Sequence, residues 1–379
     1  MAGIYLHIPF CKQACYYCDF HFSTSLKRKD ELIKAIANEL VLRKSEFQKE
    51  KIETIYFGGG TPSLLTIVEI QFLLAAIYEN YQVISNPEIT LEANPDDLSE
   101  EKIIELSKTP INRLSIGIQS FFEDDLKFMN RAHTAKESKK CLEIATQYFN
   151  NITIDLIYGV PNMSTEKWRK NLQVAFEFGI PHISSYALTV EEKTVLANFI
   201  EKGKVPPIDE ELALEHFDIL VLEAEKQGFI HYEISNFGKP AYFSKHNTSY
   251  WLGEKYLGVG PSAHSFNGVE RCWNISNNTK YSKSIFENKL PVTCETLSIN
   301  NRFNEYIMTG LRTIWGVSLA KIESEFGSEF LQALTESVKP FIEKDLLEIK
   351  KDSVFNKILT TTKKGKFLAD GIASDLFVI

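Results

Sequence analysis

The sequence predicts an α/β fold in which a parallel sheet, curled into a barrel or partial barrel, carries helices on its outside. Short runs of β-branched and aromatic residues alternate along the first half of the chain with longer segments whose apolar residues recur at helical spacing. Six such strand–helix units in succession require parallel strands with crossover helices. The chain has 379 residues, more than one hydrophobic core usually organises, so a smaller second domain is also expected.

The individual elements follow from these runs. The expected strands span residues 3–8, 54–57, 88–93, 113–118, 152–157 and 182–188. The helices expected between them span residues 29–47, 67–81, 99–107, 136–148 and 165–178. Ser99 and Ser164 stand at the start of two of these helices and are suited to cap them, because a serine hydroxyl accepts a hydrogen bond from a free amide of the first turn. A further strand is expected within residues 229–237.

The overall charge and hydropathy exclude several classes of protein. The net charge of −8 argues against general binding to nucleic acid or to anionic membranes, because both favour a basic surface. No apolar run approaches the ~20 residues needed to span a bilayer. Residues 1–10 contain neither the basic start nor the long apolar segment of a signal peptide. We therefore expect a soluble, cytoplasmic protein in a reducing compartment, where free thiolates persist.

Three cysteines, Cys11, Cys15 and Cys18, lie within eight residues directly after the first expected strand. Three thiolates are one short of a closed tetrahedral zinc site, and they leave one iron of a cubane cluster without a protein ligand. His7 or His21 could complete a zinc site, so zinc is an alternative. A disulfide framework is disfavoured because the chain is long and has only six cysteines. The other cysteines are isolated, and each is expected to be a small buried residue: Cys141, Cys272 and Cys294.

Unusual residues also lie at the ends of the other expected strands. The carboxyl ends of parallel barrel strands meet on one face, where barrel enzymes build their active sites. The residues at these ends are Gly58, Gly59, Gly60, Glu92, Gln119, Asp155 and Tyr186. A glycine run lets a ligand approach the backbone closely, although it is also typical of a tight turn. Carboxylates in apolar strands are costly without a partner, which would be a ligand or, alternatively, Arg113 or Arg131 in a buried ion pair.

The Cys-x3-Cys-x2-Cys spacing is the signature of the radical S-adenosylmethionine (SAM) superfamily, and nearly the whole sequence resembles one branch of it. That branch contains oxygen-independent coproporphyrinogen III oxidase and its relative, the haem chaperone family HemW. The matching segments are residues 5–11 (YLHIPFC), 58–62 (GGGTP), 91–95 (LEANP), 118–120 (IQS), 130–133 (NRAH) and 155–159 (DLIYG). The resemblance implies a radical SAM partial (β/α)6 barrel.

The resemblance also implies two cofactors and their sites. Cys11, Cys15 and Cys18 would hold a [4Fe-4S] cluster whose fourth iron binds the amine and carboxylate of SAM. The implied contacts of the SAM site are Tyr5, Tyr17, Gly59, Gly60, Thr61, Glu92, Gln119, Arg131, Asp155 and Ala187. Arg131 suits a carboxylate because its guanidinium presents a planar fork of donors. Ala263 could add to the wall of this pocket.

Residues 246–251 read His-Asn-x-x-Tyr-Trp and resemble the haem-binding signature associated with HemW. An imidazole can take an axial position on haem iron, while Tyr and Trp present flat apolar faces to a porphyrin. The resemblance therefore implies haem contacts from His246, Asn247, Tyr250 and Trp251. A lone histidine beside aromatic residues is also common in ordinary packing, so a structural turn is the alternative.

From about residue 297 the pattern changes to three helices, expected over residues 302–312, 318–326 and 330–344, and a hairpin of residues 347–349 with 357–360. This order resembles a winged-helix-like α+β domain. It offers no dense basic stripe, so we expect a lid or substrate-handling domain rather than a nucleic-acid binder. The expected domains are therefore the barrel, residues 1–237, an extension with the haem motif, residues 238–296, and the C-terminal domain, residues 297–379.

Two features separate the chain from the oxidases of this branch. Those enzymes carry an additional cysteine two residues after the third ligand, where this chain has Phe20, and a substantial extension before the cluster, where this chain has four residues before Tyr5. The resemblance therefore implies a haem chaperone that delivers haem to respiratory haemoproteins. A coproporphyrinogen III oxidase is the second hypothesis, and a radical SAM haem methyltransferase or ring-opening enzyme is the third.

The haem chaperone hypothesis implies several partners. They are haem or a porphyrin, a respiratory haemoprotein as acceptor and an electron donor to the cluster, whereas nucleic acid is not expected. A homodimer and peripheral membrane association through the acceptor are compatible with the sequence. The residues leave open whether SAM is cleaved or only bound.

Overall fold

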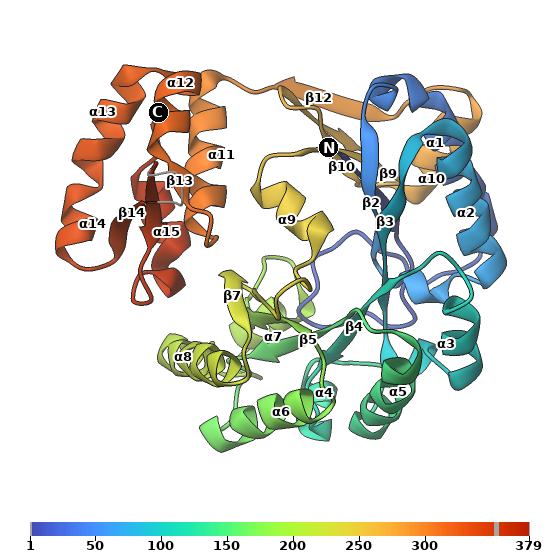
Figure 1. The fold of residues 1–379 in the computed structure, drawn as a ribbon. Helices are drawn as coiled ribbons and strands as arrows, with labels where there is room; N and C mark the ends of the chain where they lie inside the picture. The colour runs from blue at the N-terminus through green and yellow to red at the C-terminus, as the bar shows by residue number, and fades with distance from the viewer. Residues whose placement is uncertain (1, 352–355, 379) are drawn as a thin grey trace.

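Parallel strands form the centre of a curved twelve-stranded sheet in the computed structural model, which describes residues 2–351 and 356–378 (Figure 1). Within that described part, the strand order is β12-β11-β10-β9-β1-β2-β3-β4-β5-β6-β8-β7. The parallel strands are β9 (Lys255–Val259), β1 (Ala2–Ile8), β2 (Lys51–Gly59), β3 (Gln82–Ala93), β4 (Arg113–Gln119), β5 (Ile152–Tyr158) and β6 (His182–Ala187). The predicted parallel α/β barrel is confirmed.

Antiparallel strands extend this sheet at both edges. They are β8 (Asn236–Gly238) and β7 (Ile230–Glu233) beside β6, and β10 (His264–Phe266), β11 (Glu270–Asn274) and β12 (Val292–Thr296) beyond β9. The outermost strands of the described sheet are β12 and β7, so the barrel is partial, as predicted. The single strand expected within residues 229–237 is instead two short antiparallel strands, β7 and β8.

The segment of residues 238–296, expected as an extension of the barrel, shares its sheet. Strand β9 lies parallel to β1, with Gly3 opposite Tyr256 and Tyr5 opposite Gly258. The sequence did not predict this strand because its partner is about 250 residues away in the chain and nothing local reveals the pairing. Helix α9 (Lys245–Trp251) precedes β9 and carries the His-Asn-x-x-Tyr-Trp motif.

The helices of the barrel lie outside the sheet (Figure 1). The expected ones are α1 (Lys29–Leu42), α2 (Ile67–Asn80), α3 (Glu100–Leu106), α5 (Ala135–Tyr148) and α6 (Thr165–Glu177). The structure adds α4 (Glu123–Phe128), α7 (Val195–Glu201), α8 (Glu210–Lys226) and α10 (Asn278–Phe286). The hydroxyls of Ser99 and Ser164 accept hydrogen bonds from the amides of Lys102 and Lys167, both at 3.2 Å, which confirms the two predicted caps.

The C-terminal lobe has its own apolar core, which includes Phe303, Ile307 and Leu359. Its elements are α11 (Ile299–Leu311), β13 (Val317–Ser318), α12 (Leu319–Phe326), α13 (Ser328–Ser337), α14 (Lys339–Glu343), β14 (Leu347–Lys351), β15 (Lys357–Thr361) and α15 (Ala369–Asp375). The three strands form one antiparallel sheet in the order β13-β15-β14. The winged-helix-like arrangement is therefore confirmed.

One predicted helix of this lobe is wrong. The single helix expected over residues 330–344 is two helices, α13 and α14, which meet at Val338. Pro340 lies in the first turn of α14. A proline has no amide hydrogen and its ring crowds the preceding turn, so it is tolerated at a helix start but not within a continuous helix.

Two of the cysteines expected to be singly buried are bonded to each other. Cys272 on β11 and Cys294 on β12 lie directly opposite in the antiparallel pair and form a disulfide, and Cys294 is exposed. The third, Cys141, is free and buried as expected.

Across the described ranges, no helix is long and apolar enough to cross a membrane.

Candidate cofactor site

The cysteine loop that follows β1 is held by hydrogen bonds to distant parts of the chain. The amide of Cys11 donates to the carbonyl of Ser23 at 3.1 Å. The side-chain amide of Asn130, beyond α4, donates to the carbonyl of Ala14 at 2.7 Å. These contacts fix the backbone that carries the thiols. The three loop thiols are free and half-buried: Cys11, Cys15 and Cys18.

A cysteine binds metal as its thiolate, so the loop thiols have to lose their protons before they can act as ligands. Burial raises the pKa of Cys18 to about 11 and also raises the pKa of Cys11. The guanidinium Nη1 of Arg131 lies 3.3 Å from the sulfur of Cys15, so one positive charge already faces the loop. Because the thiolate is the form that binds metal, iron binding would draw the protons from these thiols.

The donor set fits an iron–sulfur cluster better than a zinc ion. The Nε2 atom of His7 lies 2.9 Å from the carbonyl oxygen of His21, and the Nε2 atom of His21 lies 2.7 Å from Oδ1 of Asn278. The Nδ1 atom of His7 also has a partner, the hydroxyl of Tyr5 at 3.1 Å, so both nitrogens of His7 are engaged. Across residues 2–351 and 356–378, no three His, Cys, Asp or Glu side chains are grouped to hold one metal ion. A cubane places its cysteine sulfurs on separate irons, so it does not require such a group.

The glycine run at the end of β2 lets the carboxylate of Glu92, on β3, lie close to the backbone of β2. A Cβ atom on Gly58 would lie within 2.9 Å of the rings of both Tyr5 and Tyr56, and 3.1 Å from a carboxylate oxygen of Glu92. Gly59 has a φ of +105°, a conformation that favours glycine, and its amide donates to Glu92 Oε2 at 3.1 Å. The hydroxyl of Tyr56 donates to Glu92 Oε1 at 2.8 Å.

The two strand-end carboxylates are electrostatically linked. Burial raises the pKa of Glu92 to about 7, while its hydrogen bonds from Tyr56 and Gly59 act in the opposite direction. Burial, and then the charge of Glu92, raise the pKa of Asp155 to about 7. Buried Arg113 from β4 lowers both pKa values, yet its Nε and Nη2 atoms have no hydrogen-bond partner among the residues that the structure describes. A cationic ligand between the carboxylates would relieve their mutual repulsion.

Arg131 connects the cysteine loop to the ends of β3 and β4. Its Nη1 atom also donates to the hydroxyl of Tyr17 at 3.3 Å, and its Nη2 atom donates to Oδ1 of Asn94 at 2.5 Å and to the carbonyl of Gly117 at 3.0 Å. The guanidinium of Arg131 is thus bonded to these groups and not to Glu92 or Asp155, with which a buried ion pair was the alternative expectation. Gln119 is buried with a φ of 63°, and its amide nitrogen would lie 2.9 Å from a Cβ on Gly117.

The other expected contacts lie around the same face of the sheet. Tyr5 donates to or accepts from Nδ1 of His7 at 3.1 Å, and the amide of buried Thr61 donates to the carbonyl of Phe10 at 2.7 Å. Ala187 ends β6 opposite Tyr158, and Ala263 is buried beyond β9. Tyr186, by contrast, is 44% exposed.

Sequence reasoning missed Tyr56 and Asn94, although both are hydrogen-bonded within the site. The signal for Tyr56 was a hydroxyl inside an otherwise apolar strand. The signal for Asn94 was its position between a strand and Pro95, where the chain turns.

His246 lies inside the packing between α9 and the barrel. Its Nδ1 atom is 2.7 Å from the hydroxyl of Thr54, and its Nε2 atom is 2.7 Å from the hydroxyl of Tyr250. The ring is 1% exposed and stacks on Tyr56 with centroids 4.9 Å apart. Burial lowers the pKa of His246 to about 3, so the ring is neutral. In this conformation both ring nitrogens have partners, so His246 presents no free nitrogen to a haem iron, and its contact with haem stays a prediction.

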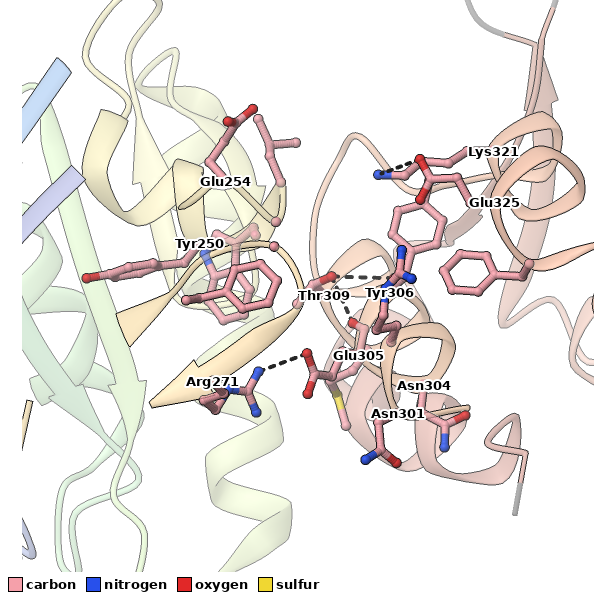
Figure 2. A pocket seen from close by; sticks show the side chains of 18 of the residues that line it. Tyr250, Glu254, Arg271, Asn301, Asn304, Glu305, Tyr306, Thr309, Lys321 and Glu325 are labelled. Carbon is pink, nitrogen blue, oxygen red and sulfur yellow. Dashed lines mark hydrogen bonds and ion pairs between the residues drawn. The ribbon is translucent and has the colours of Figure 1, made fainter. Parts of the chain in front are cut away.

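A cavity of about 580 Å³ lies beside α9, between the barrel and the C-terminal lobe (Figure 2). Of the four expected haem contacts, Tyr250 and Trp251 line it, whereas His246 and Asn247 do not. Arg271 of β11 and Glu305 of α11 form an ion pair of 2.8 Å that joins the two sides. The other aromatic residues of the lining are Tyr256, Phe266, Tyr306, Phe326 and Phe377. The cavity is therefore both aromatic and charged.

Two family models match the chain. The Radical SAM superfamily model matches residues 5–182, and the HemN C-terminal domain model matches residues 297–368. The first range covers β1 to β5 of the barrel and ends at the first residue of β6, and the second covers most of the C-terminal lobe. Helix α9 and strand β11, which form one side of the cavity, lie between the two matches.

Several relatives cover most of the chain. A protein named heme chaperone HemW from Lactococcus lactis is 36% identical over 90% of each chain, and one from Bacillus subtilis is 32% identical over 98% of each. Among solved structures, the radical SAM enzyme coproporphyrinogen III oxidase (HemN) from Escherichia coli superposes with a TM-score of 0.84 at 22% identity. That match covers 100% of this chain and 90% of the enzyme. At that identity, the likeness to the enzyme shows the fold.

Proposed function

Because the chain belongs to the HemW family of the radical SAM superfamily, we propose that it is a haem chaperone that binds a [4Fe-4S] cluster, SAM and haem and passes haem to a respiratory haemoprotein. The observation that carries this proposal is the match, at 30–36% identity over at least 84% of this chain, to five relatives named heme chaperone HemW. The proposed acceptor is a haemoprotein that lacks its haem.

Cys11, Cys15 and Cys18 would hold the cluster, and the backbone contacts of Ser23 and Asn130 would keep their loop in place. When bound, the cluster would supply one-electron chemistry and an open iron for SAM. An external electron donor would have to reduce it. The positive charge of Arg131 beside Cys15 would help to balance the negative charge of the thiolates.

The strand-end residues would bind and orient SAM. Gly59, Gly60 and Thr61 would offer backbone groups, and Tyr5 and Tyr17 would enclose the ligand near the cluster. Glu92 and Asp155 would face its positive charge, because burial leaves these carboxylates in need of a cation. Arg131 and Gln119 would face its carboxylate with nitrogen donors. Ala187 would complete the wall at the end of β6.

Haem would contact helix α9, whose Tyr250 and Trp251 line the cavity next to the barrel. Asn247 is half-buried on the same helix and would contact the haem at the edge of the cavity. His246 would act by holding Tyr250 in place rather than as an iron ligand.

Coproporphyrinogen III oxidase chemistry is the second candidate, favoured by the fold match to that enzyme. Phe20, where the oxidases of the resemblance carry an additional cysteine, is 67% exposed beside the cysteine loop and cannot replace a thiol in binding metal. This difference favours the chaperone.

A parallel assay separates the two functions. The full-length chain is reconstituted anaerobically and is offered haem or coproporphyrinogen III, each with SAM and a reductant. The chaperone hypothesis expects a stable haem complex and no protoporphyrinogen. Turnover of coproporphyrinogen III to protoporphyrinogen would reverse the assignment.

A further inference from the structure

The cavity between α9 and the C-terminal lobe has the size and the walls of a small-molecule site. Its volume, about 580 Å³, falls within the range of roughly 300–1,000 Å³ that such sites occupy. We propose that it is the porphyrin chamber of this protein, and that Arg271 binds a porphyrin carboxylate in competition with Glu305. This inference rests on the proposed function, because it names where and how the haem would be held.

Flat aromatic side chains face the chamber from both lobes. On the barrel side, Tyr250 packs edge-on against Tyr256 with centroids 4.5 Å apart. On the other side, the rings of Tyr306 and Phe326 lie nearly parallel, with an interplanar angle of 18°. Two aromatic walls on separate elements suit a planar macrocycle, since each face of the ligand would find apolar surface.

Positively charged side chains lie next to these aromatic rings. The ammonium of Lys321 lies 4.6 Å from the ring centre of Tyr306, and the guanidinium of Arg302 lies 5.8 Å from that of Phe326. Arg271 reaches the chamber from β11. A ligand that combines a large apolar plane with carboxylates at its edge would use both features, and haem is such a molecule. Arginine suits this role because its planar fork matches a carboxylate.

In the structure Arg271 already forms an ion pair with Glu305, so the carboxylate of Glu305 would compete with a ligand carboxylate for the guanidinium. Its Nη2 atom lies 2.8 Å from Oε2 of Glu305, and both side chains are 34% exposed, so an incoming carboxylate can reach the pair. Glu305 lies on the opposite lobe, as Figure 2 shows. A bound propionate would therefore exchange with Glu305, and the ion pair would re-form when the haem leaves. Such an exchange lowers the affinity, which suits a protein that has to release its ligand.

The test uses the reconstituted full-length chain and two probes, iron protoporphyrin IX and its dimethyl ester, which lacks free carboxylates. Arg271→Gln should weaken binding of the free acid about tenfold and leave binding of the ester unchanged. Glu305→Gln should tighten binding of the free acid roughly twofold to fivefold, because the competitor is gone. The matched control is Arg169→Gln, which removes an ion pair of 2.9 Å to Glu223 between α6 and α8, and neither of these residues lines the chamber.

The outcomes separate this inference from the proposed function. If wild type binds haem while Arg271→Gln and Glu305→Gln both match Arg169→Gln, the chamber is wrong and the chaperone function stands. An equal loss of ester and free acid in Arg271→Gln also overturns it, because the carboxylate would not be the recognised group. If wild type binds neither porphyrin, the proposed function itself fails. Circular dichroism and iron content, unchanged in the variants, would exclude misfolding.

Discussion

The imidazole of His246 and the hydroxyl of Tyr250 are joined by a hydrogen bond of 2.7 Å within one turn of helix α9. His246 is buried and also bonds Thr54 of β2, so it anchors the helix to the barrel. Tyr250 lines the cavity on the other side of this bond. The histidine of the His-Asn-x-x-Tyr-Trp motif is thus placed to orient Tyr250 rather than to present a free ring nitrogen to a ligand.

Removing the His246 ring should destabilise the protein without changing the ligation of haem iron. His246→Ala leaves Thr54 and Tyr250 without their partner and opens a void, so the free energy of unfolding should fall by roughly 2–4 kcal/mol. Haem affinity should fall several-fold while the Soret maximum stays in place. Denaturant unfolding and absorption spectra measure these effects, with exposed His264→Ala as the control. A shifted Soret band at unchanged stability would make His246 a ligand after all.

The cluster should depend on three of the cysteines alone. Replacing Cys11, Cys15 or Cys18 by Ala should abolish the uptake of about four irons per chain, because a [4Fe-4S] cluster needs each of these thiolates. Cys141→Ala should retain it, since that thiol is buried on the inner face of α5, apart from the loop. Iron analysis and the visible charge-transfer band after anaerobic reconstitution decide the matter. One zinc and no iron in the wild-type chain would refute the cluster.

SAM binding should depend on Glu92. Glu92→Gln keeps the shape of the side chain but removes its charge, so SAM affinity should drop on the order of tenfold to a hundredfold, with cluster content intact. Calorimetry on the reconstituted chain measures the change. Glu101→Gln, on the surface of α3, is the matched control. Equal affinities for the two variants would remove Glu92 from the site.

The carboxyls of Glu92 and Asp155 should each contribute a share of stability to the cofactor-free chain that is lost as the pH rises from about 4 to about 7. The folded protein raises the pKa of Glu92 from 4.5 to about 7 and that of Asp155 from 3.8 to about 7. Across this window each of these two carboxyls binds a proton more tightly in the folded state than in the unfolded state, so its contribution to stability falls with rising pH. Buried histidines such as His246, whose pKa is lowered to about 3, contribute with the opposite sign. Thermal unfolding at several pH values tests this. The difference in stability between Glu92→Gln and wild type should shift in favour of the variant as the pH rises, and a difference that does not depend on pH would contradict the raised pKa.

The disulfide between Cys272 and Cys294 should contribute to stability in oxidised preparations. It closes a loop with a sequence separation of 22 residues, for which the chain-entropy model gives about 3 kcal/mol. Cys294→Ser should lower the free energy of unfolding by up to that amount in the absence of reductant, and should have little effect in its presence. Thiol labelling of the unfolded, unreduced chain should find four of the six cysteines. Labelling of all six would show that the bond does not form.

Local sequence patterns predicted the parts of this molecule that local physics determines. The alternation of strands and helices gave the barrel, and the strand ends gave the positions of Glu92, Gln119 and Asp155. The partners of His246 could not be predicted in the same way, because Thr54 is 192 residues distant and belongs to another strand. The pairing of β9 with β1 and the cavity between the lobes likewise arise only when distant segments meet.

Arg271 and Cys272 are neighbours on β11, so their side chains point to opposite faces of the strand. Reconstitution of an iron–sulfur cluster requires reductants that keep the three loop thiols reduced, and the same reagents can cleave the bond between Cys272 and Cys294 by thiol exchange. Purification chemistry would then determine which of two covalent forms of the chain is assayed. A haem affinity measured before reduction and one measured after it would describe two different molecules, which differ on the strand that carries Arg271.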